Sequence, residues 1–505
     1  MKAFFTQRNN FGHLLFWILL AVNIYPIFSV AYFYTGDGPA HLYNATLLND
    51  LLFSENPFSN HFFEIRSLFI PNMGGHALLC FFLQFLDPAI AEKMVYALEI
   101  LLLAVGFKSV LGLREDGNVW PLFLILPLLN NFCFYIGFQS FCLALGLALF
   151  VCRLLFDTRF GKSNRITLAF SLLLLFTAWC HIVPAIFVLI AWFSFQLDSL
   201  LKKKYVFRVK SLISIFPAII FSGTFILQNS GQNSFETLDF LEPWKLLLSF
   251  QALIPYNLID QRLAVLFYTA LILIGLIFVF IYTNEYQNRA TLLTALFLLA
   301  LYFILPNNFS QGGYLSIRLL LGVFVFLAVF IAFNLSLKFT LVLAPLLIAI
   351  NIAQIYQNKE EINYLSAYAE KVLDSTQHIP PNMTMVPLVY SSHWIHYNLG
   401  LYPSAFVSGA NMDNYEASET EFPVRWKVNL APDHRLGLFG SSRRPPFALE
   451  PYESETGERI DIVLRIGYEE SMTSDSTTVK TNELLNSRFV KTAQGEKYQV
   501  WERKE

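Results

Sequence analysis

The chain has 505 residues, of which 55% are hydrophobic and 14% charged, and its mean hydropathy is +0.49. A soluble globular protein carries roughly 25% charged residues, so this composition excludes an ordinary soluble domain and indicates an integral membrane protein. The formal net charge of −2 is not informative about nucleic acid, but the sequence has no basic tail of the kind that such binding needs. We therefore expect membrane lipids and not nucleic acid as partners.

The five cysteines all lie in apolar segments, and none forms a Cys-x-x-Cys pair. We interpret them as small buried hydrophobic residues and expect neither a disulfide framework nor a zinc site from them. The first apolar span, about residues 12–33, is too long for a signal-peptide core, so we expect it to remain as a membrane anchor.

The segment Thr35–His41 directly follows this first span and carries an aspartate and a histidine. Its glycines and Pro39 end any helix there, so the chain must leave the span in a turn. Ionisable side chains held at a bilayer surface are functional candidates, and we predict that Asp37 and His41 are catalytic. A helix that begins at Pro39 would place them on neighbouring turns. In the alternative interpretation, Asp37 only caps that helix.

About 11 apolar segments approach the length of a bilayer crossing, roughly 20 residues. The shorter apolar run 72–86 contains two glycines, a histidine and a glutamine, and we predict an interfacial helix there instead of a crossing. The predicted spans are 12–33, 90–112, 119–136, 138–156, 166–179, 183–199, 211–227, 263–283, 290–305, 319–335 and 339–356.

Lysine and arginine are concentrated in alternate loops, which is the positive-inside pattern of a membrane protein. This pattern places the N-terminus in the cytoplasm, and an odd number of spans then places the residues after Ile355 on the outer side. We therefore expect a multi-pass protein of the cell (inner) membrane with a first outer loop at 34–89. The most basic of the inner loops contains Lys202, Lys203, Lys204, Arg208 and Lys210.

The composition changes at about residue 358, where charge rises and membrane-length spans cease. The apolar spacing of 360–374 predicts a helix, and the runs 383–390 and 460–466 predict strands. Near the end, 488–492 and 497–503 predict a hairpin that turns at Gln494-Gly495.

The fold class that we expect is therefore an all-α polytopic membrane domain with a C-terminal α/β extracytoplasmic domain. The first would cover residues 1–356, with about 11 transmembrane helices and additional interfacial helices. The second would cover residues 357–505.

Arg318 opens a predicted span on the outer face, where positive charge is disfavoured. Its planar guanidinium suits a phosphate group, and the preceding Gly312-Gly313 pair allows close approach of the backbone. We predict substrate-binding roles for Arg318 and the nearby Tyr314; the alternative is an arginine that snorkels at a helix end. His181, between two short spans, is a further candidate, although such a histidine is more often an interfacial anchor.

Amide side chains flank an aromatic turn between two predicted spans, and amides beside aromatic rings suit sugar hydroxyls and ring faces. The same pattern also fits an ordinary membrane-interface belt. The candidate substrate-binding residues here are Asn130, Asn131 and Gln139, with His76 of the first outer loop as a further one. Two C-terminal clusters either extend this site or only pack the domain: His393, Trp394 and His396, and Asn414, Tyr415 and Glu416.

An early aspartate in the first outer loop, many spans, interfacial helices and a C-terminal extracytoplasmic domain together resemble the GT-C glycosyltransferases. This superfamily includes protein O-mannosyltransferases, aminoarabinose transferases and oligosaccharyltransferases. The resemblance covers residues 10–356 in architecture and rests locally on Gly36-Asp37-Gly38-Pro39, where members carry an essential acidic base or metal partner. Arg318 looks like the family's late outer-loop arginine near the lipid phosphate. A second acidic residue, common in the family, is missing from 130–139, which puts a two-carboxylate metal site in doubt.

This resemblance implies an inverting glycosyltransferase of the bacterial cell envelope. It would move a sugar from a polyprenyl-phosphate donor to a lipid, glycan or protein acceptor on the outer face of the membrane. Asp37 would act as general base, and Arg318 would stabilise the departing phosphate. No cofactor is certain, and a divalent metal at Asp37 is left open.

Two alternatives come from other functional classes. A lipid or oligosaccharide transporter or flippase predicts polar residues at midplane depth and repeated halves, neither of which this sequence displays. A non-catalytic assembly protein for surface polysaccharide is the other alternative, and the sequence does not discriminate against it.

Overall fold

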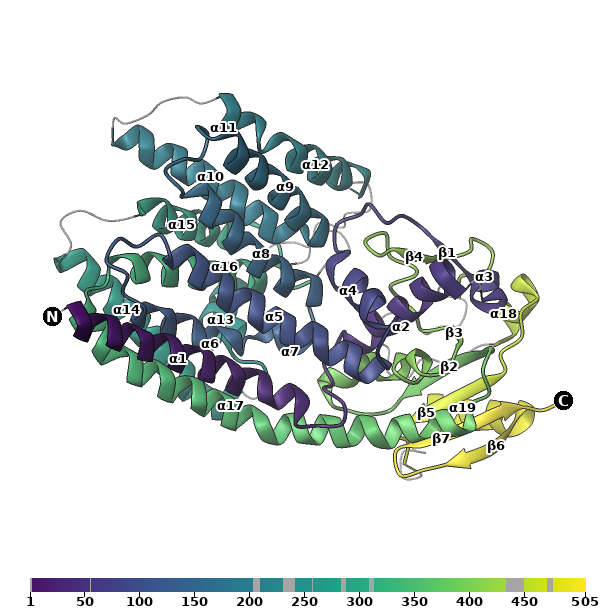
Figure 1. Cartoon of the computed structure of the whole chain (residues 1–505). Coiled ribbons are helices and arrows are strands. Elements are labelled where there is room, and N and C mark those ends of the chain that lie inside the picture. Colours follow the sequence, from purple (N-terminus) through teal and green to yellow (C-terminus); the bar gives the residue numbers. More distant parts are fainter. Residues whose placement is uncertain are drawn as a thin grey trace. The chain divides into compact units, whose positions relative to one another are not determined.

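The structure of the chain is a computed structural model that describes residues 2–54, 56–202, 209–229, 241–256, 258–282, 288–307, 313–432, 449–469 and 476–505. It forms two compact units (Figure 1). Unit 1 contains residues 1–29 and 96–361, and unit 2 contains residues 30–95 and 362–505. The helices α5 (Pro88–Leu111) and α17 (Leu337–Leu373) each contribute residues to both units.

Unit 1 is built from helices. It includes most of α5 and of α17. Its other helices are α1 (Lys2–Phe28), η2 (Trp120–Ile125), α6 (Leu126–Leu129), α7 (Phe132–Ile136), α8 (Gln139–Leu155), α9 (Asn164–Cys180), α10 (Ile182–Leu201), α11 (Val209–Ile213), α12 (Phe216–Asn229), α13 (Glu242–Ser249), η4 (Gln251–Leu253), α14 (Leu258–Tyr282), α15 (Arg289–Ile304) and α16 (Leu315–Asn334).

Within the part of the chain that the structure describes, seven helices are long and apolar enough to cross a membrane, and four further apolar helical segments have 10–17 residues. Every predicted span has one of these helices as its counterpart. The chain is therefore a multi-pass membrane protein, as expected, while the number of crossings and their orientation remain predictions.

Three predicted helix boundaries were wrong. α1 ends at Phe28 and not near residue 33. The segment 119–136 is not one helix, because the side-chain oxygen of Asn131 accepts a hydrogen bond from Phe134 N at 3.1 Å and starts a new helix, α7. The expected separate helix at 360–374 is the end of α17, whose residues 346–373 include no glycine or proline to interrupt it.

A buried amide network joins α1 to α17 and to the end of α6. Asn23 and Asn351 exchange two hydrogen bonds of 2.9 Å, and Asn130 donates to the Asn23 oxygen at 2.8 Å. Asn351 also donates to the Leu126 carbonyl at 3.0 Å. In a lipid environment such polar contacts between helices add to van der Waals packing, so this network helps to fix the interior of unit 1.

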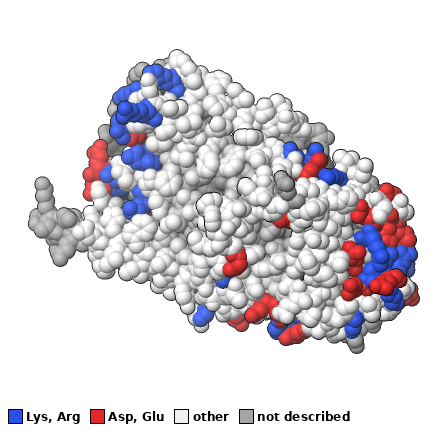
Figure 2. Space-filling model, turned by 45° about the vertical axis from the view of Figure 1, so that its right-hand side comes forward, with Lys and Arg blue, Asp and Glu red and all other residues white. Residues whose placement is uncertain are grey.

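The outward side chains of unit 1 are apolar where water-soluble proteins would carry charge. On α14, Leu263 and Phe267 are 66% and 64% exposed, and Ile281 is 65% exposed. Figure 2 shows a broad area of the visible face without lysine, arginine, aspartate or glutamate. Such a surface fits contact with lipid tails.

Glycines allow α5 and α8 to approach closely inside unit 1. A Cβ atom on Gly146 would lie 2.7 Å from Leu102 Cβ, and one on Gly106 would lie 2.6 Å from the Gly146 carbonyl oxygen. Small residues at a contact between membrane helices let the two backbones pack against each other.

Unit 2 combines the first outer loop with the C-terminal residues. Its central five-stranded sheet has the order β3-β2-β5-β7-β6, with β2 parallel to β3 and β5, and β7 antiparallel to β5 and β6. Its strands are β1 (Phe63–Ile65), β2 (Met383–Val389), β3 (Gly409–Asn411), β4 (Val424–Trp426), β5 (Ile462–Ile466), β6 (Phe489–Gln494) and β7 (Tyr498–Arg503). Its helices are α2 (Gly38–Asn49), η1 (Asp50–Ser54), α3 (Pro57–Phe62), α4 (Gly74–Phe82), η5 (Asp374–His378), η6 (Trp394–Leu401), η7 (Pro403–Ala405), α18 (Leu449–Thr456) and α19 (Ser476–Arg488).

The predicted strands of the C-terminal region are confirmed. The central strand β5 is buried along its whole length and is apolar except for Arg465, whose buried guanidinium donates to the side-chain oxygen of Asn482. The final hairpin pairs β6 with β7 and turns at Gly495, whose N–H donates to the Tyr498 carbonyl at 2.9 Å. The C-terminal sheet domain expected from the sequence is therefore present.

The segment 34–89 packs with C-terminal residues. Strand β1 pairs with β4 in a two-stranded antiparallel sheet, with Glu64 opposite Arg425. This pairing is non-local, so the sequence carried no signal for it.

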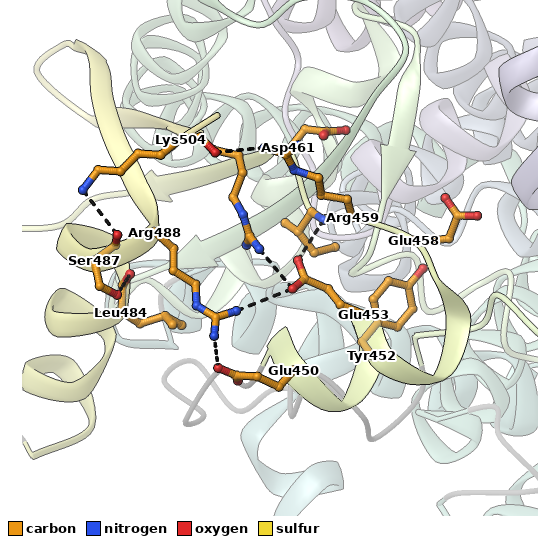
Figure 3. Close-up of polar contacts among 12 residues, drawn as sticks. Glu450, Tyr452, Glu453, Glu458, Arg459, Asp461, Leu484, Ser487, Arg488 and Lys504 are labelled. Atoms are coloured by element: carbon orange, nitrogen blue, oxygen red, sulfur yellow. Dashed lines mark hydrogen bonds and ion pairs between the residues drawn. The ribbon is translucent and has the colours of Figure 1, made fainter.

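Ion pairs tie the outer helices of unit 2 to its sheet. Figure 3 shows Arg488 of α19 between Glu450 and Glu453 of α18. Glu453 also pairs with Arg503 of β7 at 3.1 Å, and Lys504 donates to the Ser487 carbonyl at 3.3 Å. The exposed Arg488–Glu450 pair contributes little to stability, whereas the Arg503–Glu453 pair is more buried. The buried apolar residues of β5 and β7 form the core of this part.

We predict that Gly146→Val destabilises the protein, because the added methyl groups must push α5 and α8 apart. Overpacking of this kind costs about 1–3 kcal/mol, and the thermal unfolding midpoint in detergent should fall. Gly223→Val on α12 is the matched control, since a Cβ there meets no atom within 4 Å. Equal midpoints for the two variants would contradict the close packing.

Candidate functional site

The carboxylate of Asp37 is held by two side chains. Asp37 occupies the N-cap position of α2 but makes no side-chain capping bond. Its Oδ1 instead accepts hydrogen bonds from the Tyr397 hydroxyl at 2.6 Å and from Asn398 Nδ2 at 3.1 Å. The interpretation in which Asp37 only caps the helix is therefore wrong.

The local sequence builds the turn that presents Asp37. The Gly38 N–H donates to Thr35 Oγ1 at 3.1 Å, and Pro39 lies in the first turn of α2. Proline suits this position because the first N–H groups of a helix have no partner inside it. The turn before α2 is thus built without a side-chain capping bond from Asp37.

Tyr397 and Asn398, which sequence reasoning missed, lie on η6. The Tyr34 hydroxyl donates to the Ile395 carbonyl at 3.1 Å and ties this short helix to the segment before α2. The bond between Tyr397 and Asp37 joins residues 360 positions apart, so no local pattern could have revealed it. The only nearby signal was the polar-aromatic cluster of His393, Trp394 and His396.

His41, His76 and Glu416 form one buried cluster. Glu416 Oε1 lies 2.5 Å from His41 Nδ1, and Glu416 Oε2 lies 2.9 Å from His76 Nε2. The imidazole rings are 5.0 Å apart, and both contact the ring of Phe422. His41 comes from α2, His76 from α4 and Glu416 from the segment between β3 and β4. Asp37 contributes no atom to this cluster.

The cluster keeps Glu416 ionised. Burial by itself would raise the pKa of Glu416, but the charges of His41 and His76 and their hydrogen bonds lower it to about 2. Burial likewise acts to lower the pKa of His41, but the Glu416 carboxylate outweighs it, and the pKa of His41 is raised. A buried charge of this kind is tolerated only when its partners satisfy it.

Polar contacts dock α2 onto the segment that carries Glu416. The Tyr43 hydroxyl donates to the Gly409 carbonyl at 2.8 Å and accepts from the Asn411 N–H at 2.9 Å. The Asn44 and Asn414 amides exchange hydrogen bonds of 2.8 and 3.0 Å, and both are buried. One face of α2 therefore fixes the place of Glu416 relative to His41.

In unit 1, aromatic rings surround the predicted phosphate-binding arginine. The guanidinium carbon of Arg318 lies 4.1 Å from the centre of the Phe138 ring. The Tyr314 ring is 5.9 Å from the same ring. Tyr314 itself begins α16 in a left-handed conformation, with φ of 61°. A cation this close to the Phe138 ring gains a cation–π attraction, which favours this position of the guanidinium.

The other predicted substrate-binding residues of unit 1 differ in their contacts. His181 caps α10, because its Nδ1 accepts from the Val183 N–H at 3.1 Å, and its ring meets Phe141 edge-on. Asn130 belongs to the buried amide network with Asn23, and Asn131 caps α7. Gln139 is fully buried, and its side-chain oxygen and nitrogen have no hydrogen-bond partner among the described residues.

The structure thus groups the predicted residues into two sets. Asp37, His41 and His76 belong to unit 2, while Arg318, Tyr314, His181, Asn130, Asn131 and Gln139 belong to unit 1. Catalytic and substrate-binding roles for these residues remain predictions, as does a shared substrate for Asp37 and Arg318. Gly312, Lys203, Lys204 and Arg208 lie outside the described residues.

We predict that Asn414→Ala loosens the docking of α2. The change leaves the buried Asn44 oxygen without its donor, which costs about 1–3 kcal/mol. The thermal unfolding midpoint in detergent should fall accordingly. Asn486→Ala, at an exposed position of α19, should leave the midpoint unchanged; a similar loss in both variants would argue against a special role for the Asn44–Asn414 pair.

Comparison with known proteins identifies the fold. No protein-family model matches the sequence, and no curated protein is similar to it in sequence. The crystal structure of ArnT from Cupriavidus metallidurans bound to undecaprenyl phosphate matches with a TM-score of 0.53 at 8% identity, over 97% of each chain. The apo crystal structure of ArnT from the same organism matches with a TM-score of 0.49 at 8% identity, over 96% of this chain and 97% of that one. The expected resemblance in architecture is thus confirmed at the level of the fold: along almost its whole length, the chain has the fold of the ArnT that was crystallised with undecaprenyl phosphate.

Proposed function

We propose that this protein is a membrane glycosyltransferase that transfers a sugar from a polyprenyl-phosphate donor to an acceptor, with Asp37 as general base. The observation that carries the proposal is the position of the Asp37 carboxylate, which Tyr397 and Asn398 hold away from the helix that it could cap. A carboxylate oriented in this way is suited to accept a proton from a reacting group. The undecaprenyl phosphate bound to ArnT, whose fold this chain shares, supports a polyprenyl-phosphate donor.

The proposed reaction is a displacement at the anomeric carbon of the donor sugar. The acceptor hydroxyl oxygen attacks this carbon, and Asp37 takes the hydroxyl proton. The bond between the carbon and the phosphate oxygen breaks, its electron pair leaves with the polyprenyl phosphate, and the configuration at the carbon inverts. Tyr397 and Asn398 act as positioning residues in this proposal, because their hydrogen bonds hold the Asp37 carboxylate.

Arg318 has an electrostatic role in this proposal. Its guanidinium offers two parallel N–H donors, the arrangement that binds phosphate best, and the Phe138 ring attracts it. A fixed positive charge at the leaving group favours the transition state, where negative charge develops on the phosphate. The buried amide of Gln139 is proposed as a further hydrogen-bonding group for the same ligand. The positive-inside pattern supports a reaction on the outer face of the membrane.

Asp37→Asn should abolish sugar transfer, because the amide cannot accept the proton. A general base contributes about 100- to 10,000-fold, and kcat should fall by that factor. The assay is the release of undecaprenyl phosphate from a set of undecaprenyl-phosphate-linked sugars, in proteoliposomes supplied with a cell-envelope extract. Binding of undecaprenyl phosphate, measured by thermal shift, should persist in the variant.

Asp87→Asn is the matched control for this change. Asp87 is an exposed carboxylate of the same segment that accepts a hydrogen bond from the Ile90 N–H, and asparagine caps a helix equally well. Tyr397→Phe should reduce kcat less than Asp37→Asn does, with little change in KM. Wild-type turnover by a correctly folded Asp37→Asn variant would refute the proposal, as would lipid movement across the membrane without any sugar transfer by the wild type.

Arg318→Ala should weaken the binding of undecaprenyl phosphate. A hydrogen bond to a charged group is worth about 1.5–3 kcal/mol, so Kd should rise roughly 10- to 100-fold. Arg318→Lys keeps the positive charge but loses the two parallel N–H donors of the guanidinium. Its Kd should lie between those of the wild type and of Arg318→Ala. Arg262→Ala, an exposed arginine near the start of α14, should bind like the wild type. An unchanged Kd for Arg318→Ala would remove Arg318 from the phosphate site.

A further inference from the structure

We propose that His41, His76 and Glu416 bind a divalent metal ion of the zinc type. One ligand atom from each of the three side chains lies within 4.8 Å of the others. All three residues are buried, with exposures of 6%, 1% and 0%. Two imidazole nitrogens and one carboxylate oxygen form a known donor set for zinc, which leaves a fourth position for water or another ligand.

The type of ligand restricts the type of ion. Imidazole nitrogen suits zinc and other late first-row metals, whereas magnesium and calcium prefer an all-oxygen shell. The five cysteines are all outside this cluster, so the site lacks the thiolates of most structural zinc sites. A site with two histidines and one glutamate is therefore expected to take zinc, and to accept cobalt in its place.

The nitrogens that face the Glu416 carboxylate are His76 Nε2 and His41 Nδ1. Donor atoms from three separate segments therefore converge on one buried point, as the ligands of a bound ion do. His76 Nδ1, the other nitrogen of its ring, is buried and has no hydrogen-bond partner among the described residues.

Carboxylates near the cluster also favour a cation. Besides Glu416, the carboxylates of Asp37 and Glu92 act electrostatically on His41. A divalent ion bound by the three ligands would be attracted by these negative charges.

Such an ion would act on the position of Asp37. His41 lies one turn after Asp37 on α2, and its N–H donates to the Asp37 carbonyl at 3.0 Å. The ion would join this turn to α4 and to the segment before β4, from which the other two ligands come. With the ion bound, His41 and His76 would act as metal ligands that position α2. Metal binding can be measured without any transfer assay, so the inference stands apart from the proposed function.

The first experiment measures the metal content of the full chain, purified in detergent without chelators, by mass spectrometry of the elements. We expect about one zinc ion per chain. After removal of the metal and addition of Co²⁺, the visible absorption bands of four-coordinate cobalt should appear. His76→Asn and Glu416→Gln should lose the metal and these bands, with an affinity at least about 100-fold lower, since even outer-shell changes cost 10- to 100-fold.

His61→Asn is the matched control. His61 makes a histidine–glutamate contact like those in the cluster, because its Nε2 lies 2.7 Å from Glu458 Oε1. Its side chain, however, is 53% exposed. This variant should keep its metal. A second measurement needs no variant: chelation should lower the thermal unfolding midpoint of the wild type, and added Zn²⁺ should restore it.

Two results would overturn the inference. The first is a wild-type protein without bound metal, without cobalt bands and with a midpoint that neither chelator nor Zn²⁺ shifts; the cluster would then be held by hydrogen bonds alone. The second is metal that remains at full occupancy in both His76→Asn and Glu416→Gln, which would place the ion elsewhere.

Discussion

The Glu416 carboxylate is the contact on which the candidate site depends. It joins the imidazoles of His41 and His76, and these come from two helices of the first outer loop, while Glu416 itself comes from the C-terminal part of the chain. A buried carboxylate without partners would be costly, so the three side chains stabilise only this one arrangement. Asp37 lies at the start of α2, and His41 lies one turn later. The contact between His41 and Glu416 therefore also helps to hold the turn that carries Asp37.

A second set of polar contacts has a comparable role in the membrane unit. Asn23, Asn130 and Asn351 connect helices from the beginning, the middle and the end of unit 1 through buried amide bonds. Exposed apolar side chains on α14 point away from the interior of unit 1. In lipid they gain little by packing against another helix instead of lipid tails, so they do not select a particular helix as partner. Directional amide bonds and close glycine contacts then supply the specificity that hydrophobic burial cannot supply in lipid.

The fold of this protein is identified by its similarity to a solved structure, whereas its proposed chemistry is argued from individual side chains. A match over 97% of the chain at 8% identity identifies the architecture. One fold can serve several chemistries, so the proposed function depends on particular atoms: the oriented carboxylate of Asp37 and the guanidinium of Arg318. The cluster of His41, His76 and Glu416 belongs to neither group, and its donor atoms are the basis of the proposed metal site.

Composition and apolar periodicity alone determined the membrane class, the approximate positions of the predicted spans and four of the five strands of the C-terminal sheet, because these depend on contacts within a short stretch of chain. They gave no signal for β3, the remaining strand. The sequence also marked Asp37 and His41, since an ionisable pair beside a span is costly. Only the tertiary structure decided that Tyr397 and Asn398 hold Asp37, that Glu416 joins His41 to His76, and that β1 pairs with β4. Those contacts link residues more than 300 positions apart, and local propensity has no information about partners at such a distance.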